Sequence, residues 1–220
     1  MNLHELKVKI TLIDDILGTI PADSETYKKW VVKKYLEEAN DETELARRQA
    51  QVEKDADHIP DLDEEISNGM TVFAHDANGK PAILAYNIKG FFKSACKALR
   101  DVPDSKSKAF KNYKGRIDQN IFVYGTEDPE KTGNVIPLHL AEETDICERP
   151  LRAETMQGPR VALACSERNA KGAWMLVTVK TLTGDLLDLV REWLDYGELS
   201  GLGQWRSSGK GRFVWEEIKD

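Results

Sequence analysis

Hydrophobic and polar residues alternate near the start of the chain. Leu6, Val8, Ile10 and Leu12 are separated by polar residues, and this period of two predicts a strand with one buried face. The turn pair Asn78-Gly79 favours the positive φ angles of a tight hairpin. Short apolar runs bounded by turn residues predict the remaining strands, including the two arms of that hairpin, over 71–75, 81–85, 120–124, 149–155, 160–166, 173–181 and 212–218.

Two amphipathic helices are predicted, over 88–99 and 184–196. Apolar residues recur there every three or four positions, as they do on the buried side of a helix. We expect Asn87 and Thr183 to cap the two N-termini, because their short polar side chains accept hydrogen bonds from free backbone N–H groups.

The predicted elements follow the order strand, helix, strand, strand, helix, strand once the inserted segments are set aside. This is the order of a ferredoxin-like or RRM-like βαββαβ core, so the expected fold class is α+β. We expect residues 1–220 to form one domain around that core, with β-hairpin excursions and a lysine-rich flexible loop over 101–118. An acidic helical insertion is expected over 22–69, with helices at 24–38 and 42–55.

The composition fits this globular interpretation. Hydrophobic residues make up 40% and charged residues 31% of the 220 positions, and no apolar run approaches the roughly 20 residues of a membrane span. The first residues lack the pattern of a secretion signal. Cys96, Cys147 and Cys165 are odd in number and have no CxxC spacing, which favours reduced thiols and a cytoplasmic protein. Secreted, fibrous, membrane-embedded and wholly disordered classes are therefore excluded.

Positive charge is concentrated in one part of an acidic chain. The net charge is −7, yet residues 80–120 contain ten basic and three acidic side chains, a net +7, so the remainder carries −14. A basic patch of this kind attracts phosphate to one groove of an otherwise repelling molecule. A solvated charged loop is the alternative that the count leaves open.

The most specific motif lies between the second helix and the last strand, over 201–211. Its pattern is GxGxxxxxGxG, in which glycines permit positive φ angles and close approach to a ligand. Arg206 and Lys210 add positive charge, Ser207 adds a hydroxyl group, and Trp205 offers a face for stacking, a combination that suits a sugar-phosphate strand. Rossmann and Walker loops are excluded, because both follow a strand and precede a helix. A glycine-rich turn without a ligand remains the alternative.

In this position the loop resembles the signature of the RAMP superfamily, the RNA-binding proteins of CRISPR effector complexes. Residues 87–95 (NIKGFFKSA) are similar to the SLKGALRSA stretch that opens the first core helix in the family's backbone subunits, and Lys89, Gly90 and Lys93 fall at its Lys, Gly and Arg. The segment 149–152 (RPLR) resembles a basic strand segment of the family. The acidic insertion and the lysine-rich loop match no part of the pattern.

The resemblance implies a groove for single-stranded RNA, in particular a guide RNA. We expect Lys93 and Arg206, which are far apart in the chain, to line one trough after folding. The RNA groove is extended by Arg149, Arg152 and Arg160, or these arginines pair with carboxylates instead. The full set of expected RNA-binding residues is Lys89, Gly90, Lys93, Lys97, Arg149, Arg152, Arg160, Gly201, Gly203, Trp205, Arg206, Ser207, Gly209, Lys210 and Gly211.

No catalytic residue, metal ion or cofactor is expected. RNA cleavage beside a 2′-hydroxyl usually needs a base in the groove, and no recognisable catalytic spacing includes His4, His58, His75 or His139. Asp14 and Asp15 follow the first strand in a loop that departs from the RNA-cleaving members of the family. The acidic residues near Asp61 lack the spacing of a calcium loop.

Three functions remain open on sequence alone. We favour a non-catalytic RNA-binding subunit of a CRISPR-type ribonucleoprotein in antiviral defence, with other effector subunits or copies of itself as partners in an oligomer. The second is a phage-encoded RAMP-like interaction protein that inhibits or imitates a CRISPR complex by docking its acidic insertion. The third is a metal-independent endoribonuclease.

Overall fold

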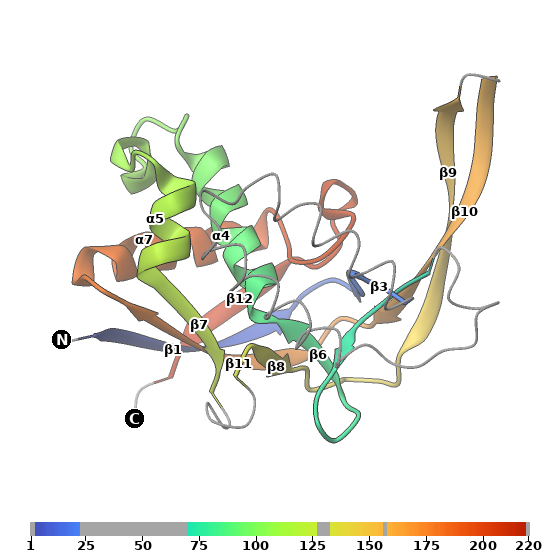
Figure 1. The fold of residues 1–220 in the computed structure, drawn as a ribbon, viewed down its shortest axis with the longest axis horizontal. Helices are drawn as coiled ribbons and strands as arrows, with labels where there is room; N and C mark the ends of the chain where they lie inside the picture. The colour runs from blue at the N-terminus through green and yellow to red at the C-terminus, as the bar shows by residue number, and fades with distance from the viewer. Residues whose placement is uncertain (1–2, 23–69, 127–132, 156–157, 219–220) are drawn as a thin grey trace, which may run out of the picture.

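The largest sheet has four antiparallel strands. The computed structural model describes residues 3–22, 70–126, 133–155 and 158–218, with only the backbone path for 151–155 and 159–163. The sheet order is β12-β1-β11-β7, and every neighbouring pair is antiparallel (Figure 1). Its strands are β1 (His4–Leu12), β7 (Ile121–Gly125), β11 (Trp174–Thr181) and β12 (Phe213–Glu217).

Two helices complete the βαββαβ unit. Helix α4 (Ala85–Leu99) lies between β1 and β7 in the chain, and α7 (Gly184–Asp195) connects β11 to β12. Numbered along the chain, the four strands lie in the order 4-1-3-2, which is the ferredoxin-like arrangement. The predicted α+β class and ferredoxin-like core are confirmed.

The alternation that predicted the first strand is also the alternation of its burial. Leu6, Val8, Ile10 and Leu12 are each at most 1% exposed, whereas the residues between them are partly exposed. These four side chains belong to one hydrophobic core with residues of α4 and α7. The two helices therefore cover one face of the sheet, and aromatic pairs such as Phe92–Trp193, with ring centroids 5.6 Å apart, join them.

Two smaller sheets flank the core. One contains β2 (Ile16–Leu17), β3 (Ile20–Pro21), β4 (Met70–Val72) and the long strands β9 (Asp145–Thr155) and β10 (Gly158–Asn169). The β9–β10 hairpin projects away from the body of the molecule (Figure 1). The other sheet contains β5 (Ala74–His75), β6 (Pro81–Leu84) and β8 (Val135–Pro137).

The predicted hairpin around Asn78-Gly79 is confirmed as β5–β6. Gly79 has a φ of 75°, and the Asp76 carboxylate accepts hydrogen bonds from the backbone N–H groups of Asn78 and Lys80, both at 2.8 Å. Thr71 was expected in the same hairpin, but it belongs to β4, which pairs in parallel with β10.

The predicted cap of the first core helix is wrong. Helix α4 begins at Ala85, and Leu84 occupies its N-cap position. Asn87 lies in the first turn and donates a hydrogen bond to the Thr19 hydroxyl, at 2.8 Å. Thr183 does occupy the N-cap position of α7, but its side chain makes no capping hydrogen bond.

The lysine-rich segment over 101–118, expected as a loop excursion, forms regular structure. It contains a short 3₁₀ helix, η1 (Lys106–Ala109), and the start of α5 (Tyr113–Asn120). Glu192 of α7 accepts hydrogen bonds from two backbone N–H groups at the start of η1, and Trp193 donates to Ser107 at 2.8 Å. Phe110 and Ile117 are buried as well. Tertiary contacts with α7 thus order a segment whose composition resembles a solvated loop.

The acidic insertion predicted over 22–69, with its helices at 24–38 and 42–55, falls outside the described residues except for Ala22. His58 and Asp61 fall outside them too. In the described part of the chain, no helix is long and apolar enough to cross a membrane.

Candidate nucleic-acid interface

The glycine-rich loop closes on itself at a narrow neck, formed by Gly201, Leu202 and Gly211. The backbone N–H of Leu202 donates to the carbonyl oxygen of Gly211 at 2.8 Å, and the Leu202 side chain is 1% exposed. A Cβ atom on Gly201 would lie 2.0 Å from the carbonyl carbon of Gly211. Gly211 has a φ of 73°, and a Cβ there would lie 2.0 Å from the carbonyl oxygen of Leu202. Both glycines are therefore required by contacts within the loop, whatever it binds.

Beyond the neck the loop is an ordered projection. Trp205 has a φ of 59°, and the 3₁₀ turn η3 (Arg206–Ser208) follows it. Gln204 donates a hydrogen bond to the carbonyl oxygen of Gly18 at 2.9 Å, which fastens the loop to the β2–β3 segment. Gly203 and Gly209 also have positive φ angles, of 77° and 81°.

The two cations at the C-terminal end of the loop are paired with carboxylates. Lys210 lies 2.7 Å from Asp15, and Arg212 lies 2.5 Å from Asp14. The Lys210 ammonium group, by its hydrogen bond and charge, holds the pKa of Asp15 below its usual value, with help from the backbone N–H of Lys171 and from Arg168. The aspartates that follow β1 thus anchor the loop, and Lys210 is engaged in that anchor.

Arg206 is different from these two cations. Its side chain is exposed and, within the described part of the chain, it has no hydrogen bond or ion pair. The neighbouring Ser207 hydroxyl is exposed as well. The tip of the loop therefore presents a guanidinium group and a hydroxyl group, both of which bind phosphate oxygens.

Trp205 contacts the β9–β10 hairpin. The guanidinium group of Arg149 on β9 lies over the indole ring as a cation–π pair. The Nε atom of Arg149 and the Nε1 atom of Trp205 are buried without a hydrogen-bond partner. Two of the expected RNA-binding residues are thus brought together, and one face of the expected stacking ring is covered by the protein itself.

Helix α4 and the loop line a common depression, which we call the hollow. It has a volume of about 820 Å³ and contains no carboxylate in its lining. Figure 1 shows the loop beside α4. The lining residues are Ser94 of α4 together with Tyr196, Leu199, Ser200, Gly203, Gln204, Trp205, Arg206 and Ser207.

The lysines of α4 are not part of the hollow. Lys93 forms an ion pair with Asp118 of α5 at 2.7 Å, and Lys89 donates to the Asp118 carbonyl oxygen at 3.4 Å and lies over the Phe122 ring. The expectation that Lys93 and Arg206 line one trough is not met in the hollow, because Lys93 pairs with Asp118 and does not belong to the lining. Helix α4 contributes Ser94 to the lining instead, from a different face of the helix than Lys89 and Lys93.

Gly90 is a helix glycine that contacts within the described part of the chain do not explain. It is exposed in the middle of α4, and a Cβ atom there would find no heavy atom within 4 Å. Glycine inside a helix costs roughly 1 kcal/mol relative to alanine. Lys97, seven residues further along the helix, is exposed and has no ion-pair or hydrogen-bond partner for its side chain among the described residues.

Other expected residues lie apart from the hollow or outside the description. Arg152 and Arg160 lie on β9 and β10, and their side chains are outside the described part. His4, His75 and His139 do not belong to the lining of the hollow, and His139 stacks on Trp174 with ring centroids 3.7 Å apart.

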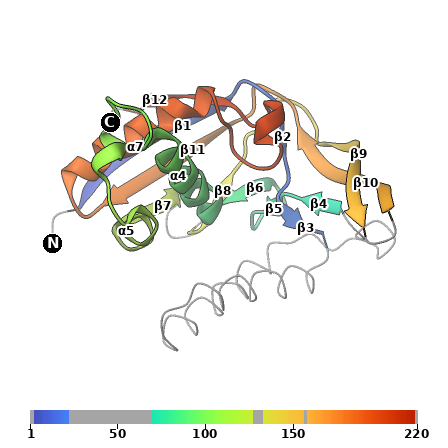
Figure 2. The same cartoon turned by 90° about the horizontal axis from the view of Figure 1, so that it is seen from above.

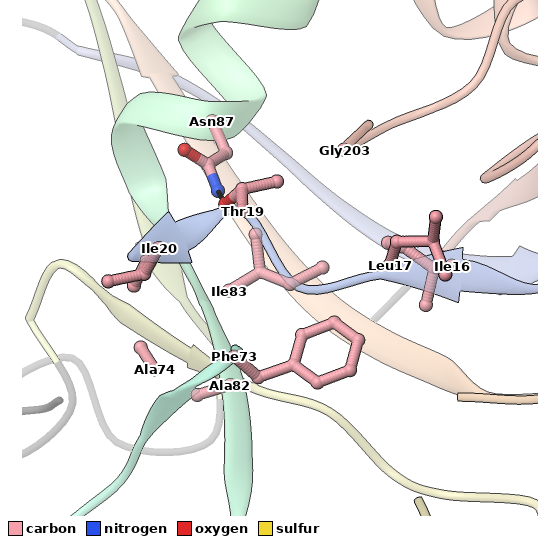
Figure 3. A pocket seen from close by; sticks show the side chains of 10 residues that line it. All are labelled: Ile16, Leu17, Thr19, Ile20, Phe73, Ala74, Ala82, Ile83, Asn87 and Gly203. Atoms are coloured by element: carbon pink, nitrogen blue, oxygen red, sulfur yellow. Dashed lines mark hydrogen bonds between the residues drawn. The ribbon is translucent and has the colours of Figure 1, made fainter. Parts of the chain in front are cut away.

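A second cavity beneath the loop is too small for a ligand. Its volume is about 10 Å³, roughly that of one water. Figure 3 shows Asn87 and Thr19 hydrogen-bonded at its edge, with apolar side chains such as Phe73 and Ile83 around it. This cavity forms part of the packing between the loop and the small sheets.

Sequence reasoning missed the part of the hollow that follows α7. Tyr196, Leu199 and Ser200 lie where the helix ends in the 3₁₀ turn η2 (Tyr196–Glu198), and the sequence there shows only a helix terminus. The one available signal was Leu199, an apolar residue between Glu198 and Ser200 in a polar stretch. It is 75% exposed.

No family model matches the chain, and no curated protein matches it. Similar solved structures include a Type III-B Cmr-beta bound to cognate target RNA, a Type IV-B CRISPR complex and Cmr6 from Pyrococcus furiosus. Their sequence identities are 13%, 9% and 14%, and their TM-scores are 0.47, 0.44 and 0.34. The matches cover 99%, 98% and 97% of this chain, and 59%, 90% and 99% of the other chains. This chain thus spans 59% of the Cmr-beta chain. Because these sequence identities and TM-scores are low, we assign the ferredoxin-like fold from the strand order of the main sheet.

Proposed function

We propose that this protein binds single-stranded RNA as a non-catalytic subunit of a CRISPR-type ribonucleoprotein in the cytoplasm. The RNA is a guide RNA, and the partners are other effector subunits or further copies of the chain. The observation that carries the proposal is the hollow, where Arg206 is exposed and no carboxylate belongs to the lining.

The chemistry of the hollow favours a sugar-phosphate strand. Arg206 supplies charge-assisted hydrogen bonds, Ser94, Ser200 and Ser207 supply hydroxyl groups, and Trp205 and Tyr196 supply aromatic surface. Proteins that bind single strands combine positive charge along the backbone with aromatic surface for the bases, and serine hydroxyl groups are common ligands of phosphate oxygens. No carboxylate belongs to the lining itself, so Arg206 is not neutralised there.

The meeting of the two motif segments supports the same function. Residues 87–95 and 201–211 are the segments that resemble RAMP proteins, and more than a hundred positions separate them. In the folded chain, Ser94 from the first segment and Arg206 from the second line the same hollow. Gly90 and Lys97 are exposed on α4, four residues before and three residues after Ser94, and they extend the proposed RNA-binding surface.

Binding to a labelled single-stranded RNA, measured by fluorescence anisotropy at several salt concentrations, tests the RNA part of the proposal. We expect the affinity to fall with salt, and Arg206→Gln to weaken it about tenfold because a charged hydrogen bond to phosphate is lost. Lys93→Gln is expected to weaken binding less, since Lys93 is already paired with Asp118. Lys111→Gln removes the same charge from an exposed residue away from the hollow and serves as the control.

Binding that does not depend on salt, or an equal loss in the Arg206 and Lys111 variants, would contradict the RNA interface. The guide-RNA part is tested separately by sequencing the RNA that copurifies with the tagged chain from its native cells. We expect spacer sequences flanked by a repeat. Recovery of bulk cellular RNA without such repeats argues against this part alone.

A further inference from the structure

The hollow is lined on one side by apolar surface that a phosphate contact does not need. Leu199 is 75% exposed, the largest exposed fraction among the large hydrophobic residues described. Tyr196 lies one turn before it and packs partly against the core. A single exposed leucine needs no explanation by itself, but this one faces a depression that also contains an indole ring and a free guanidinium group.

Trp205 also belongs to the lining of the hollow and is partly exposed. Arg149 contacts its indole ring and does not itself belong to the lining. The positive φ of Trp205 and the hydrogen bond from Ser208 N–H to its carbonyl oxygen, at 2.8 Å, fix the residue in this position.

We infer that the hollow is a nucleobase pocket, in which one unpaired base of the bound strand inserts between Trp205 and Leu199 while Arg206 binds the adjacent phosphate. The inference depends on the proposed function and goes further, because it assigns the base of a nucleotide to this site.

Size and chemistry agree with this occupant. The hollow, at about 820 Å³, is an open depression with ample room for one nucleotide of a longer strand. A nucleotide offers a flat apolar face and a charge at one end, and the hollow offers apolar and aromatic surface with a guanidinium group at its rim. Besides Arg206, the lining carries serine hydroxyl groups, the Tyr196 hydroxyl, the indole N–H of Trp205 and the Gln204 side chain, and Gln204 is occupied by Gly18. Stacking on an aromatic ring accepts every base, so we expect the pocket to show little preference among bases.

The test compares two labelled strands of equal length, about 16 nucleotides, one of uridines and one that carries the same ribose-phosphate backbone without bases. The whole chain is used in both cases. We expect the strand with bases to bind roughly 5- to 150-fold more tightly, the effect of stacking one base. Leu199→Ser should remove most of this difference by weakening only the strand with bases. Arg206→Gln should weaken both strands alike and reduce the salt slope by about 0.7, the share of one phosphate.

Leu140→Ser is the matched control, since Leu140 is also exposed, at 38%, and lies outside the lining. Equal binding of the two strands overturns the base pocket, as does a Leu199→Ser variant that weakens both strands or neither. In these cases RNA binding itself persists, so the proposed function stands. Absence of salt-dependent binding to either strand would instead overturn the proposed function and the pocket with it. Loss of a protein complex in Leu199→Ser, with RNA binding unchanged, assigns the surface to a protein partner and also overturns the pocket.

Discussion

The two flanks of helix α4 differ in how the protein uses them. On the α5-facing flank, Lys89 and Lys93 contact Asp118, so their charges contribute to the packing of α5 against α4. On the hollow-facing flank, the uncharged Ser94 lines the hollow together with the exposed Arg206 of the loop, and Lys97, three residues further along the helix, is exposed. The comparison shows that a count of basic residues does not locate an anion-binding surface. What matters is which cations remain without carboxylates after folding, and on which side of the helix they lie.

The same division is found within the loop. Lys210 is paired with Asp15, and Gly201 and Gly211 are required by the neck. Arg206 and Ser207 at the tip have no comparable structural role. The neck therefore serves folding, and the tip is the part of the loop that we propose contacts RNA.

The largest effect on the contrast between the two flanks is expected from a substitution that opens the neck, because the loop that carries Arg206 is then no longer held at the hollow. Gly211→Ala places a Cβ atom 2.0 Å from the carbonyl oxygen of Leu202 at a φ of 73°. We expect the free energy of unfolding to fall by about 3 kcal/mol or more, from the clash together with the backbone strain. Urea denaturation followed by circular dichroism measures this loss.

Gly209→Ala is the matched control for that measurement. Gly209 has a φ of 81°, but the nearest atom to its Cβ position is 3.8 Å away. This variant should lose only the strain of the left-handed conformation, about 1–2 kcal/mol. Equal losses in the two variants mean that the neck is not tightly closed.

Substitution of Asp15 tests whether its ion pair with Lys210 anchors the loop. The folded pKa of Asp15 is depressed below its ordinary value of 3.8, so its charge contributes stability above that value and loses the contribution as the pH falls through the folded pKa. Asp15→Asn should lower the free energy of unfolding by about 1 kcal/mol at neutral pH, because a partly buried, hydrogen-bonded pair with Lys210 is lost. The difference from the parent chain should shrink as the pH is lowered past 3.8.

Urea denaturation at a series of pH values measures this dependence. Asp104 is exposed, and its carboxylate has no partner among the residues that the structure describes, so Asp104→Asn is expected to change stability little at any pH. A difference between Asp15→Asn and the parent that is constant with pH would show that the carboxylate charge does not hold the loop.

The smallest expected effect concerns Gly90 of α4, where one substitution is expected to raise the stability of the protein and to weaken RNA binding. Gly90→Ala should raise the free energy of unfolding by roughly 0.8–1 kcal/mol, because alanine is the better helix former and the site is open. If the RNA strand approaches the backbone here, the added methyl group weakens RNA binding despite the gain in stability. Thermal denaturation and anisotropy measure the two quantities on the same preparation.

Gly115→Ala in α5 provides the comparison for Gly90. Its Cβ position makes only ordinary contacts, the nearest at 3.6 Å to Asn112, so a similar stability gain is expected with RNA binding unchanged. Unchanged or tighter RNA binding in Gly90→Ala means that no strand passes close to this glycine.

Much of the fold could be predicted from the sequence, because the relevant information is local. The alternation from Leu6 to Leu12, the Asn78-Gly79 turn and the apolar stripes of the two core helices each depend on residues within a few positions of one another. The failures occurred where distant contacts compete with local preference. Asn87 bonds to Thr19 instead of capping a helix, and Glu192 and Trp193 order η1 in a segment that is rich in lysine.

The sequence by itself determined the βαββαβ order, the glycine-rich loop before the last strand and the two segments that resemble RAMP proteins. Only the tertiary structure decided that Ser94 of α4 and the loop line one hollow, that Lys93 and Lys210 are paired with carboxylates, and that Leu199 and Trp205 belong to the same lining. The physical reason is that hydrophobic periodicity and turn preferences act over a few residues. The partner of a charge, and the surface that a side chain faces, depend on segments brought together from across the chain.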